Sequence, residues 1–151
     1  MNMVSRALAR RQKGEKGFTL VELLVVVIII GILAAVSVPI YLNQRKSAWN
    51  SNAEQDAKNA LTVTETVMTE NGGKLPTGFK VDCDATTGDA NSFTPNGFED
   101  QVYNCSAGVH LEVAANTTDG TTYTITASHE NGTKVFFYNS ASYAALQSSE
   151  K

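Results

Sequence analysis

The sequence predicts an α+β fold in which a long N-terminal helix packs on a small antiparallel β-sheet. Three observations predict this fold class. Residues 23–42 form an apolar run without charge, and residues 43–70 continue with helical spacing but with only one apolar stripe. The last third of the chain holds three runs in which apolar and polar residues alternate. One sheet packed on one helix is sufficient to bury a common core.

The charge distribution divides the chain into two parts. The 151 residues carry a net charge of −3, but residues 1–17 hold five basic residues and one acid, so the remainder carries −7. This balance argues against a strongly basic nucleic-acid-binding domain. The chain has two cysteines, which excludes a four-cysteine zinc site. With only two histidines besides, it offers few of the usual ligands of a metalloenzyme.

The apolar run is long enough to cross a membrane. Of the 20 residues from 23 to 42, 17 are apolar, and a helix of this length spans about 30 Å, the thickness of a bilayer hydrocarbon core. Five basic residues precede the run, whereas only Arg45 and Lys46 follow it closely. The positive-inside rule therefore places the N-terminus in the cytoplasm and the rest of the chain outside.

Three interpretations of this run compete on the residues alone. It is a permanent anchor, a signal peptide cleaved near Ala35-Val36-Ser37, or a more specialised segment. Glu22 favours the third, because a carboxylate at the edge of an apolar helix is costly and neither an anchor nor a signal peptide needs one. The alternative for Glu22 is a first-turn glutamate that the helix dipole stabilises.

The segment KGFTLVELLVVVIIIGILAAVSVPIY resembles the N-terminal signature of type IV pilins and the related pseudopilins. The matching pieces are a basic leader that ends in Gly17, then Phe18, then Glu22, then an apolar run that reaches Pro39. The resemblance implies that a membrane-embedded aspartyl peptidase cuts after Gly17 and methylates the new N-terminus at Phe18. It also implies that Glu22 pairs with the N-terminal amine of a neighbouring subunit, since a buried carboxylate needs a partner.

Gly31 and Pro39 lie inside the apolar helix. Proline removes a backbone hydrogen bond and kinks a helix, which a membrane span tolerates. The resemblance implies in addition that the stretch between these two residues unwinds in filaments and makes the fibre extensible.

The second half of the helix is expected to be amphipathic and to end near Glu70, where Gly72-Gly73 supplies a stop. Its apolar positions recur at three- and four-residue steps, as one face of a helix requires. These positions are Trp49, Ala53, Ala57, Ala60, Leu61, Thr64, Val67 and Met68.

Residues 71–107 read as a loop, because proline, glycine, aspartate and asparagine are frequent there. Cys83 and Cys105 bracket most of this loop. The predicted topology puts the loop outside the cytoplasm, where oxidation is permitted. A disulfide between the two cysteines would contribute about 3 kcal/mol. Two free thiols are the alternative.

The remaining residues predict a meander of three antiparallel strands over residues 109–113, 122–127 and 133–138. Asp119-Gly120 and Asn131-Gly132 separate these runs and are strong hairpin signals. The side chains expected to face the helix are Val109, Leu111, Val113, Tyr123, Ile125, Ala127, Val135 and Phe137.

No group of residues predicts catalysis or a cofactor. Asp82, Asp84 and Asp89 make a weak calcium candidate, because their spacing lacks the glycine and the distal glutamate of an EF-hand, and a solvated loop is the preferred interpretation. His110 and His129 lie 19 residues apart without a nearby nucleophile. We therefore expect neither an enzyme nor a bound cofactor.

The sequence thus predicts a structural subunit of a type IV pilus-like filament for adhesion, motility or surface attachment. The expected parts are a cleaved leader (1–17), a transmembrane and filament-core helix (18–42), an amphipathic helix (43–70) and a head with a disulfide-closed loop and three strands (71–151). The implied partners are other pilin subunits, the prepilin peptidase, the membrane and an assembly platform with a cytoplasmic ATPase, but no specific nucleic acid.

The expected location is the cytoplasmic membrane, as a single-pass subunit, before assembly and an extracellular filament afterwards. Three other functions remain open on the sequence. They are a pseudopilin of a type II secretion system, a competence pilin for DNA uptake, and a secreted binding module with a signal peptide.

Overall fold

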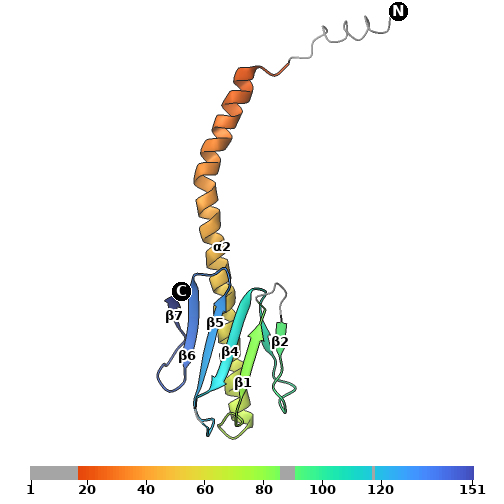
Figure 1. Cartoon of the computed structure of the whole chain (residues 1–151), viewed down its shortest axis with the longest axis vertical. Helices are drawn as coiled ribbons and strands as arrows, with labels where there is room; N and C mark the ends of the chain where they lie inside the picture. Colours follow the sequence, from red (N-terminus) through yellow and green to blue (C-terminus); the bar gives the residue numbers. More distant parts are fainter. Residues whose placement is uncertain (1–16, 86–90, 117) are drawn as a thin grey trace, which may run out of the picture. The chain divides into compact units, whose positions relative to one another are not determined.

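The computed structural model describes residues 17–85, 91–116 and 118–151 and confirms the predicted α+β class. The chain divides into two compact units, Met1–Tyr41 and Leu42–Lys151. One long helix, α2 (Leu20–Glu70), supplies the described part of the first unit from Leu20 onward and includes residues 42–70 of the second unit. In the second unit the helix packs on an antiparallel sheet (Figure 1).

The first part of α2 is apolar on every side. Its large side chains are exposed, from Leu20 (82%) through Leu33 (61%) to Leu42 (48%). By length and composition this helix is able to cross a membrane. The helix continues through Gly31 and Pro39, so the predicted kink and unwinding remain predictions.

The end of α2 follows from its glycines. The helix ends at Glu70, and Gly72 and Gly73 adopt positive φ angles of 70° and 84°. The amide of Gly73 donates to the carbonyl oxygen of Met68 at 2.7 Å, which satisfies a carbonyl of the last turn. The predicted stop at this dipeptide is therefore confirmed.

The main sheet has five strands in the order β1-β4-β5-β6-β7, and all neighbours are antiparallel. A second sheet of two strands joins β2 and β3. The strands are β1 (Lys80–Asp84), β2 (Asn91–Phe93), β3 (Tyr103–Cys105), β4 (Val109–Ala115), β5 (Tyr123–His129), β6 (Lys134–Asn139) and β7 (Gln147–Glu150).

The sheet is larger than the predicted three-stranded meander. The three expected runs form β4, β5 and β6, but β1 lies inside the segment that was expected to be a loop, and β7 adds an edge. Strand β1 forms because Val81 and Cys83 alternate with polar residues, so that one face of the strand is buried. Strand β7 is exposed along its whole length and gives no apolar signal.

The core lies between α2 and the inner face of the sheet. Six of the predicted sheet residues are buried there: Val109, Leu111, Val113, Tyr123, Ile125 and Ala127. The prediction for β6 is wrong by one residue, because Phe136 is the buried side chain whereas Val135 and Phe137 are only half-buried. Phe136 pairs with Ala127 and Tyr138 with Ile125, so these two aromatic residues share the inner face.

Gly120 shows why one turn needs glycine. It has a φ of 69°, and its carbonyl accepts a hydrogen bond from the amide of Leu75 at 2.8 Å. A Cβ atom at this position would lie 2.0 Å from the carbonyl oxygen of Leu75. The β4–β5 turn is thereby held against the segment that follows the helix.

Candidate functional site

The first turn of α2 forms a capping box. The amide and hydroxyl of Thr19 donate to Glu22 Oε2 at 2.9 and 3.0 Å, and the amide of Glu22 donates to Thr19 Oγ1 at 3.2 Å. Since the helix begins at Leu20, Thr19 is the N-cap and Glu22 the third helical residue, which is the spacing that a capping box requires. Glu22 therefore organises the start of the helix.

The surroundings of this box suit assembly through the helix. Phe18 directly precedes the cap and is 83% exposed, and residues 23–42, which follow Glu22, expose only apolar and small side chains. An ionised carboxylate accepts several hydrogen bonds, so the bonds from Thr19 leave Glu22 able to accept from a further donor. The sequence-predicted residues Gly17, Phe18 and Glu22 thus lie within the first turn and the residues before it.

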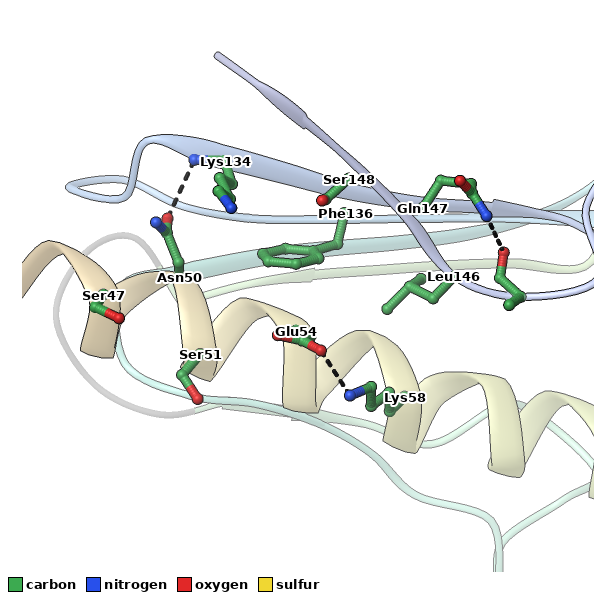
Figure 2. A pocket seen from close by; sticks show the side chains of 11 residues that line it. Ser47, Asn50, Ser51, Glu54, Lys58, Lys134, Phe136, Leu146, Gln147 and Ser148 are labelled. Carbon is green, nitrogen blue, oxygen red and sulfur yellow. Dashed lines mark hydrogen bonds and ion pairs between the residues drawn. The ribbon is translucent and has the colours of Figure 1, made fainter.

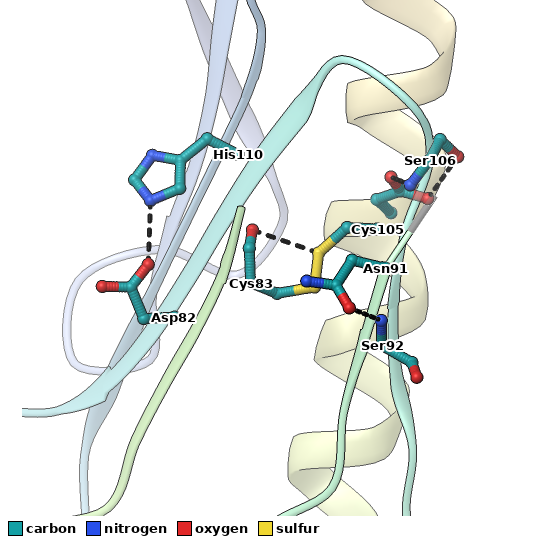
Figure 3. The surroundings of a disulfide bond; sticks show 8 residues. Asp82, Cys83, Asn91, Ser92, Cys105, Ser106 and His110 are labelled. Carbon is teal, nitrogen blue, oxygen red and sulfur yellow. Dashed lines mark hydrogen bonds and ion pairs between the residues drawn. A yellow bond between two sulfur atoms is a disulfide. The ribbon is translucent and has the colours of Figure 1, made fainter. Parts of the chain in front are cut away.

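The disulfide lies in the second unit. Cys83 on β1 is bonded to Cys105 on β3, and both residues are 1% exposed (Figure 3). The bond joins the edge of the main sheet to the two-stranded sheet and closes a segment with a sequence separation of 22 residues. The described residues thus hold both cysteines in the bonded form.

Asp56 is buried, although the apolar pattern of the helix does not predict burial of a carboxylate. It is 4% exposed on α2, and its carboxylate accepts from the amide of Ser106 at 2.6 Å and from the Ser106 hydroxyl at 3.0 Å. Burial raises the pKa of Asp56, and the two bonds from Ser106 partly oppose this shift. Its position, three residues after Ala53 and four before Ala60, is the signal that places it on the buried face.

Two further polar contacts join the helix to the sheets. The hydroxyl groups of Thr64 and Tyr103 lie 2.9 Å apart in the core, and Tyr123 donates its hydroxyl hydrogen bond to Glu65. Burial raises the pKa of Tyr103 to about 12, so this phenol stays protonated at physiological pH. Both contacts fix the sheets on one face of α2.

Asp82, one of the three residues of the weak calcium candidate, contacts basic side chains. Asp82 Oδ1 lies 3.1 Å from His110 Nε2 (Figure 3). The ammonium of Lys80 lies 3.5 Å from the other oxygen of Asp82. The hydrogen bond with His110 is the main cause that lowers the pKa of Asp82. Asp89 lies outside the described residues, and among the residues described no three acidic, histidine or cysteine side chains are placed to hold a metal.

A groove runs between α2 and the strands β6 and β7 (Figure 2). It has a volume of about 560 Å³ and is lined mainly by polar side chains. Glu54 and Lys58 form an ion pair of 2.6 Å on its helical wall, and Phe136 and Leu146 form its apolar floor.

Comparisons with known proteins match part of the chain. Residues 12–38 match the family model of the prokaryotic N-terminal methylation motif. The chain is 36% identical over 63 residues to the fimbrial protein EcpB of Eikenella corrodens, which is 42% of this chain and 38% of the relative. It is 40% identical over 58 residues to a fimbrial protein of Pseudomonas aeruginosa, which is 38% of each chain.

A third relative is also a fimbrial protein and is also matched over only part of its length. The chain is 43% identical over 54 residues to the type IV major fimbrial protein FimA of Dichelobacter nodosus, which is 36% of this chain and 35% of the relative. The alignments thus span less than two fifths of the length of these relatives. One long N-terminal helix that carries this motif and packs on an antiparallel sheet is a pilin-like fold. Over these partial alignments the chain is similar to type IV fimbrial proteins, and its N-terminal segment carries the methylation motif.

Proposed function

We propose that this chain is the precursor of a structural subunit of a type IV pilus-like filament. A prepilin peptidase cleaves it after Gly17 and methylates Phe18, and the N-terminal helix then polymerises with the helices of other subunits. The observation that carries the proposal is Glu22, a single carboxylate in the first turn of an apolar helix that follows a basic leader. The methylation motif and the fimbrial relatives support it.

Cleavage after Gly17 would create an amine one residue before the helix cap. The amine of one subunit is a cation, and Glu22 of the next subunit offers a carboxylate to pair with it. When apolar helices bundle, both charges leave water, so an unpaired charge would be very costly and the pair selects one register. Bundling keeps the side chains of residues 18–42 away from water, as the membrane does before assembly.

The location and the partners follow from this proposal. The leader stays in the cytoplasm, residues 18–42 cross the cytoplasmic membrane, and residues 43–151 lie outside. A membrane platform with a cytoplasmic ATPase would move subunits from the membrane into the filament. The head would then be displayed along the fibre for adhesion, motility or surface attachment.

The experiment is the mass and N-terminal sequence of the mature protein from its native host. An N-methylated Phe18 is the expected start. A start at Val38 would indicate cleavage by signal peptidase and would overturn the proposal, and so would an intact Met1 in a host that processes other prepilins.

A pseudopilin is the second candidate within the same family, because it would use the same helix and the same processing. The disulfide-bonded segment between β1 and β3 favours the displayed filament. A pseudopilin that acts only as a piston in protein secretion would need a smaller surface than this. Filament length in electron micrographs separates the two. Long surface fibres that contain this chain support the pilus, whereas fibres confined to the envelope support the pseudopilus.

A further inference from the structure

Two turns of the second unit share a sequence pattern and a backbone conformation. Residues 76–79 read PTGF and residues 95–98 read PNGF. In each turn the amide of the phenylalanine donates to the carbonyl oxygen of the proline, at 3.0 and 3.1 Å respectively. The third residues, Gly78 and Gly97, have φ angles of 74° and 83°. This hydrogen bond together with a positive φ at the third position is typical of a type II β-turn.

The second of these turns contains an Asn-Gly pair, which is chemically reactive. The backbone nitrogen of the residue after an asparagine is able to attack the carbonyl carbon of the asparagine side chain, and glycine hinders this attack least because it has no Cβ atom. The new C–N bond closes a succinimide ring, and the side-chain nitrogen leaves as ammonia with the proton of the backbone nitrogen. Water then opens the ring at either of its two carbonyl carbons and gives aspartate or isoaspartate. Water is thus the co-reactant, and no group is oxidised or reduced.

The chain has three Asn-Gly pairs, and the structure distinguishes them by the hydrogen bonds of the two reacting groups. The pairs begin at Asn71, Asn96 and Asn131. In the third pair, the backbone nitrogen of Gly132 donates to the carbonyl oxygen of His129 at 3.0 Å. The side-chain nitrogen of the same asparagine donates to Glu130 Oε1 at 2.9 Å. Both groups that the ring closure needs are therefore held in other contacts.

The first pair is held at the asparagine. The side-chain nitrogen of Asn71 donates to the carbonyl oxygen of Lys74 at 2.8 Å. Its backbone amide donates to the carbonyl oxygen of Val67 at 3.0 Å, directly after the end of α2. Ring closure has to break the side-chain contact first, so we expect it to be slow at this pair as well.

The second pair has neither restraint. Among the residues that the structure describes, the side chain of Asn96 and the amide of Gly97 make no hydrogen bond. Both residues are exposed, and a Cβ atom built on Gly97 would meet no atom within 4 Å. The side chain of Asn96 is therefore free to approach the nitrogen of Gly97 to the distance of about 3–3.5 Å that such a reaction requires.

We propose that Asn96 is a deamidation site, at which the folded chain forms aspartate and isoaspartate faster than at its other two Asn-Gly pairs. The product places a third carboxylate beside Glu99 and Asp100. Isoaspartate also carries the main chain through its own side chain, which inserts a methylene group into the turn. This chemistry depends on neither the processing nor the assembly of the chain.

The experiment incubates the folded full chain in detergent at neutral pH and follows each pair by mass spectrometry of its peptides. The peptides are residues 59–74 after trypsin, and residues 94–98 and 124–136 after chymotrypsin. Exchange of an amide for a carboxyl group changes the mass of a peptide, and fragment spectra locate the change. We expect this exchange to be at least about tenfold faster at Asn96 than at Asn131, because reacting groups that are held out of position lose up to about a hundredfold in rate. Equal rates at the three pairs, or a faster exchange at Asn71 or Asn131, would overturn the proposal.

Two controls show whether the fold is the cause. In the full chain unfolded by denaturant the three pairs lose their hydrogen bonds, and we expect similar rates. The same order of rates in the unfolded chain would overturn the proposal, because neighbouring sequence and not structure would then set the order. The matched variant is Asn96→Thr, since Thr77 holds the same place in the PTGF turn. This variant should keep the free energy of unfolding of the wild type, and the mass of its peptide 94–98 should stay constant.

Discussion

Asp56 shows how one residue connects the helix to the disulfide-bonded segment. Its carboxylate accepts both polar hydrogens of Ser106, the residue that follows Cys105. The position on α2 would otherwise be filled by a small apolar side chain, as at Ala53 and Ala57. The buried carboxylate thus replaces apolar packing with two hydrogen bonds from Ser106, which position the end of β3.

We predict that Asp56→Ala lowers the free energy of unfolding by about 1–3 kcal/mol, because the amide of Ser106 loses its acceptor in a buried site. The measurement is chemical denaturation of the full chain in detergent. Glu54→Ala is the control, since Glu54 makes an ion pair with Lys58 near the surface. The control is expected to cost less than about 1 kcal/mol. Equal losses in the two variants would contradict the role of Asp56.

The pH dependence of Asp56 has a defined sign. Burial raises its pKa above the ordinary value of 3.8, so the folded chain binds this proton more tightly than the unfolded chain. Its contribution to the free energy of unfolding is therefore greatest below the unfolded pKa and falls as the pH rises through the folded pKa. As the pH falls from about 7 to about 3.5, we expect the free energy of unfolding of the wild type to rise relative to that of Asp56→Asn. An unchanged difference would show that the pKa is ordinary.

At the scale of elements, the arrangement of β6 follows from pairing with its neighbour. Phe136 pairs with Ala127, whose side chain faces the helix, so Phe136 faces it as well. The sequence TKVFFY offers apolar residues on both faces, so alternation alone does not decide which of them is buried. The outer residue Phe137 instead contacts Tyr143, with ring centroids 5.7 Å apart.

This pairing predicts unequal effects of two neighbouring substitutions. Phe136→Ala opens a cavity in the core and is expected to cost about 3 kcal/mol, whereas Phe137→Ala is expected to cost about 1 kcal/mol. Both are measured by denaturation under the same conditions. If Phe137→Ala were the more damaging variant, the opposite face of β6 would be buried.

The disulfide ties the smaller sheet to the larger one. We expect replacement of Cys83 and Cys105 by alanine to lower the free energy of unfolding by about 3 kcal/mol, as expected for a loop of this length. Reduction of the wild-type chain by a thiol reagent should give a loss of similar size, and the double variant should not respond to the reagent. A wild-type stability that is unchanged on reduction would contradict this prediction.

The elements differ in how far the sequence predicts them. The helix is predictable from its apolar run and its terminal glycines, and β4 and β5 from their alternation. Strand β1 has the same alternation in KVDCD, but the turn-forming residues around it favoured a loop. Strand β7 pairs through its backbone alone, so its side chains hold no information about the pairing. Asp56 was missed because a carboxylate on a buried face depends on a partner fifty residues away.

At the scale of the whole molecule, Glu22 has two roles, one observed and one proposed. The capping box gives it a role inside one chain, whereas the proposed pairing with the amine at Phe18 gives it a role between chains. Substitution by alanine or valine removes both roles at once. A test of the proposed function therefore has to separate the cap from the charge.

Three variants of the first turn make this separation. Glutamine keeps a capping box at this position but has no charge, so Glu22→Gln removes the ion pair alone. Thr19→Ala removes the N-cap and keeps the carboxylate, at a cost of about 1 kcal/mol to the helix. We expect Glu22→Gln and Glu22→Val to lower the yield of filaments at least about tenfold, because breaking a buried charge pair costs several kcal/mol per subunit. Thr19→Ala should assemble nearly normally.

The yield is measured as the amount of this chain in filaments sheared from cells, relative to the total amount of the chain. An intact Cys83–Cys105 bond in each variant shows that the head is folded. If Glu22→Gln assembles like wild type while Thr19→Ala does not, then the cap and not the charge governs assembly. In that case subunits would join through the order of the first helical turn, and the amine of Phe18 would need no carboxylate partner.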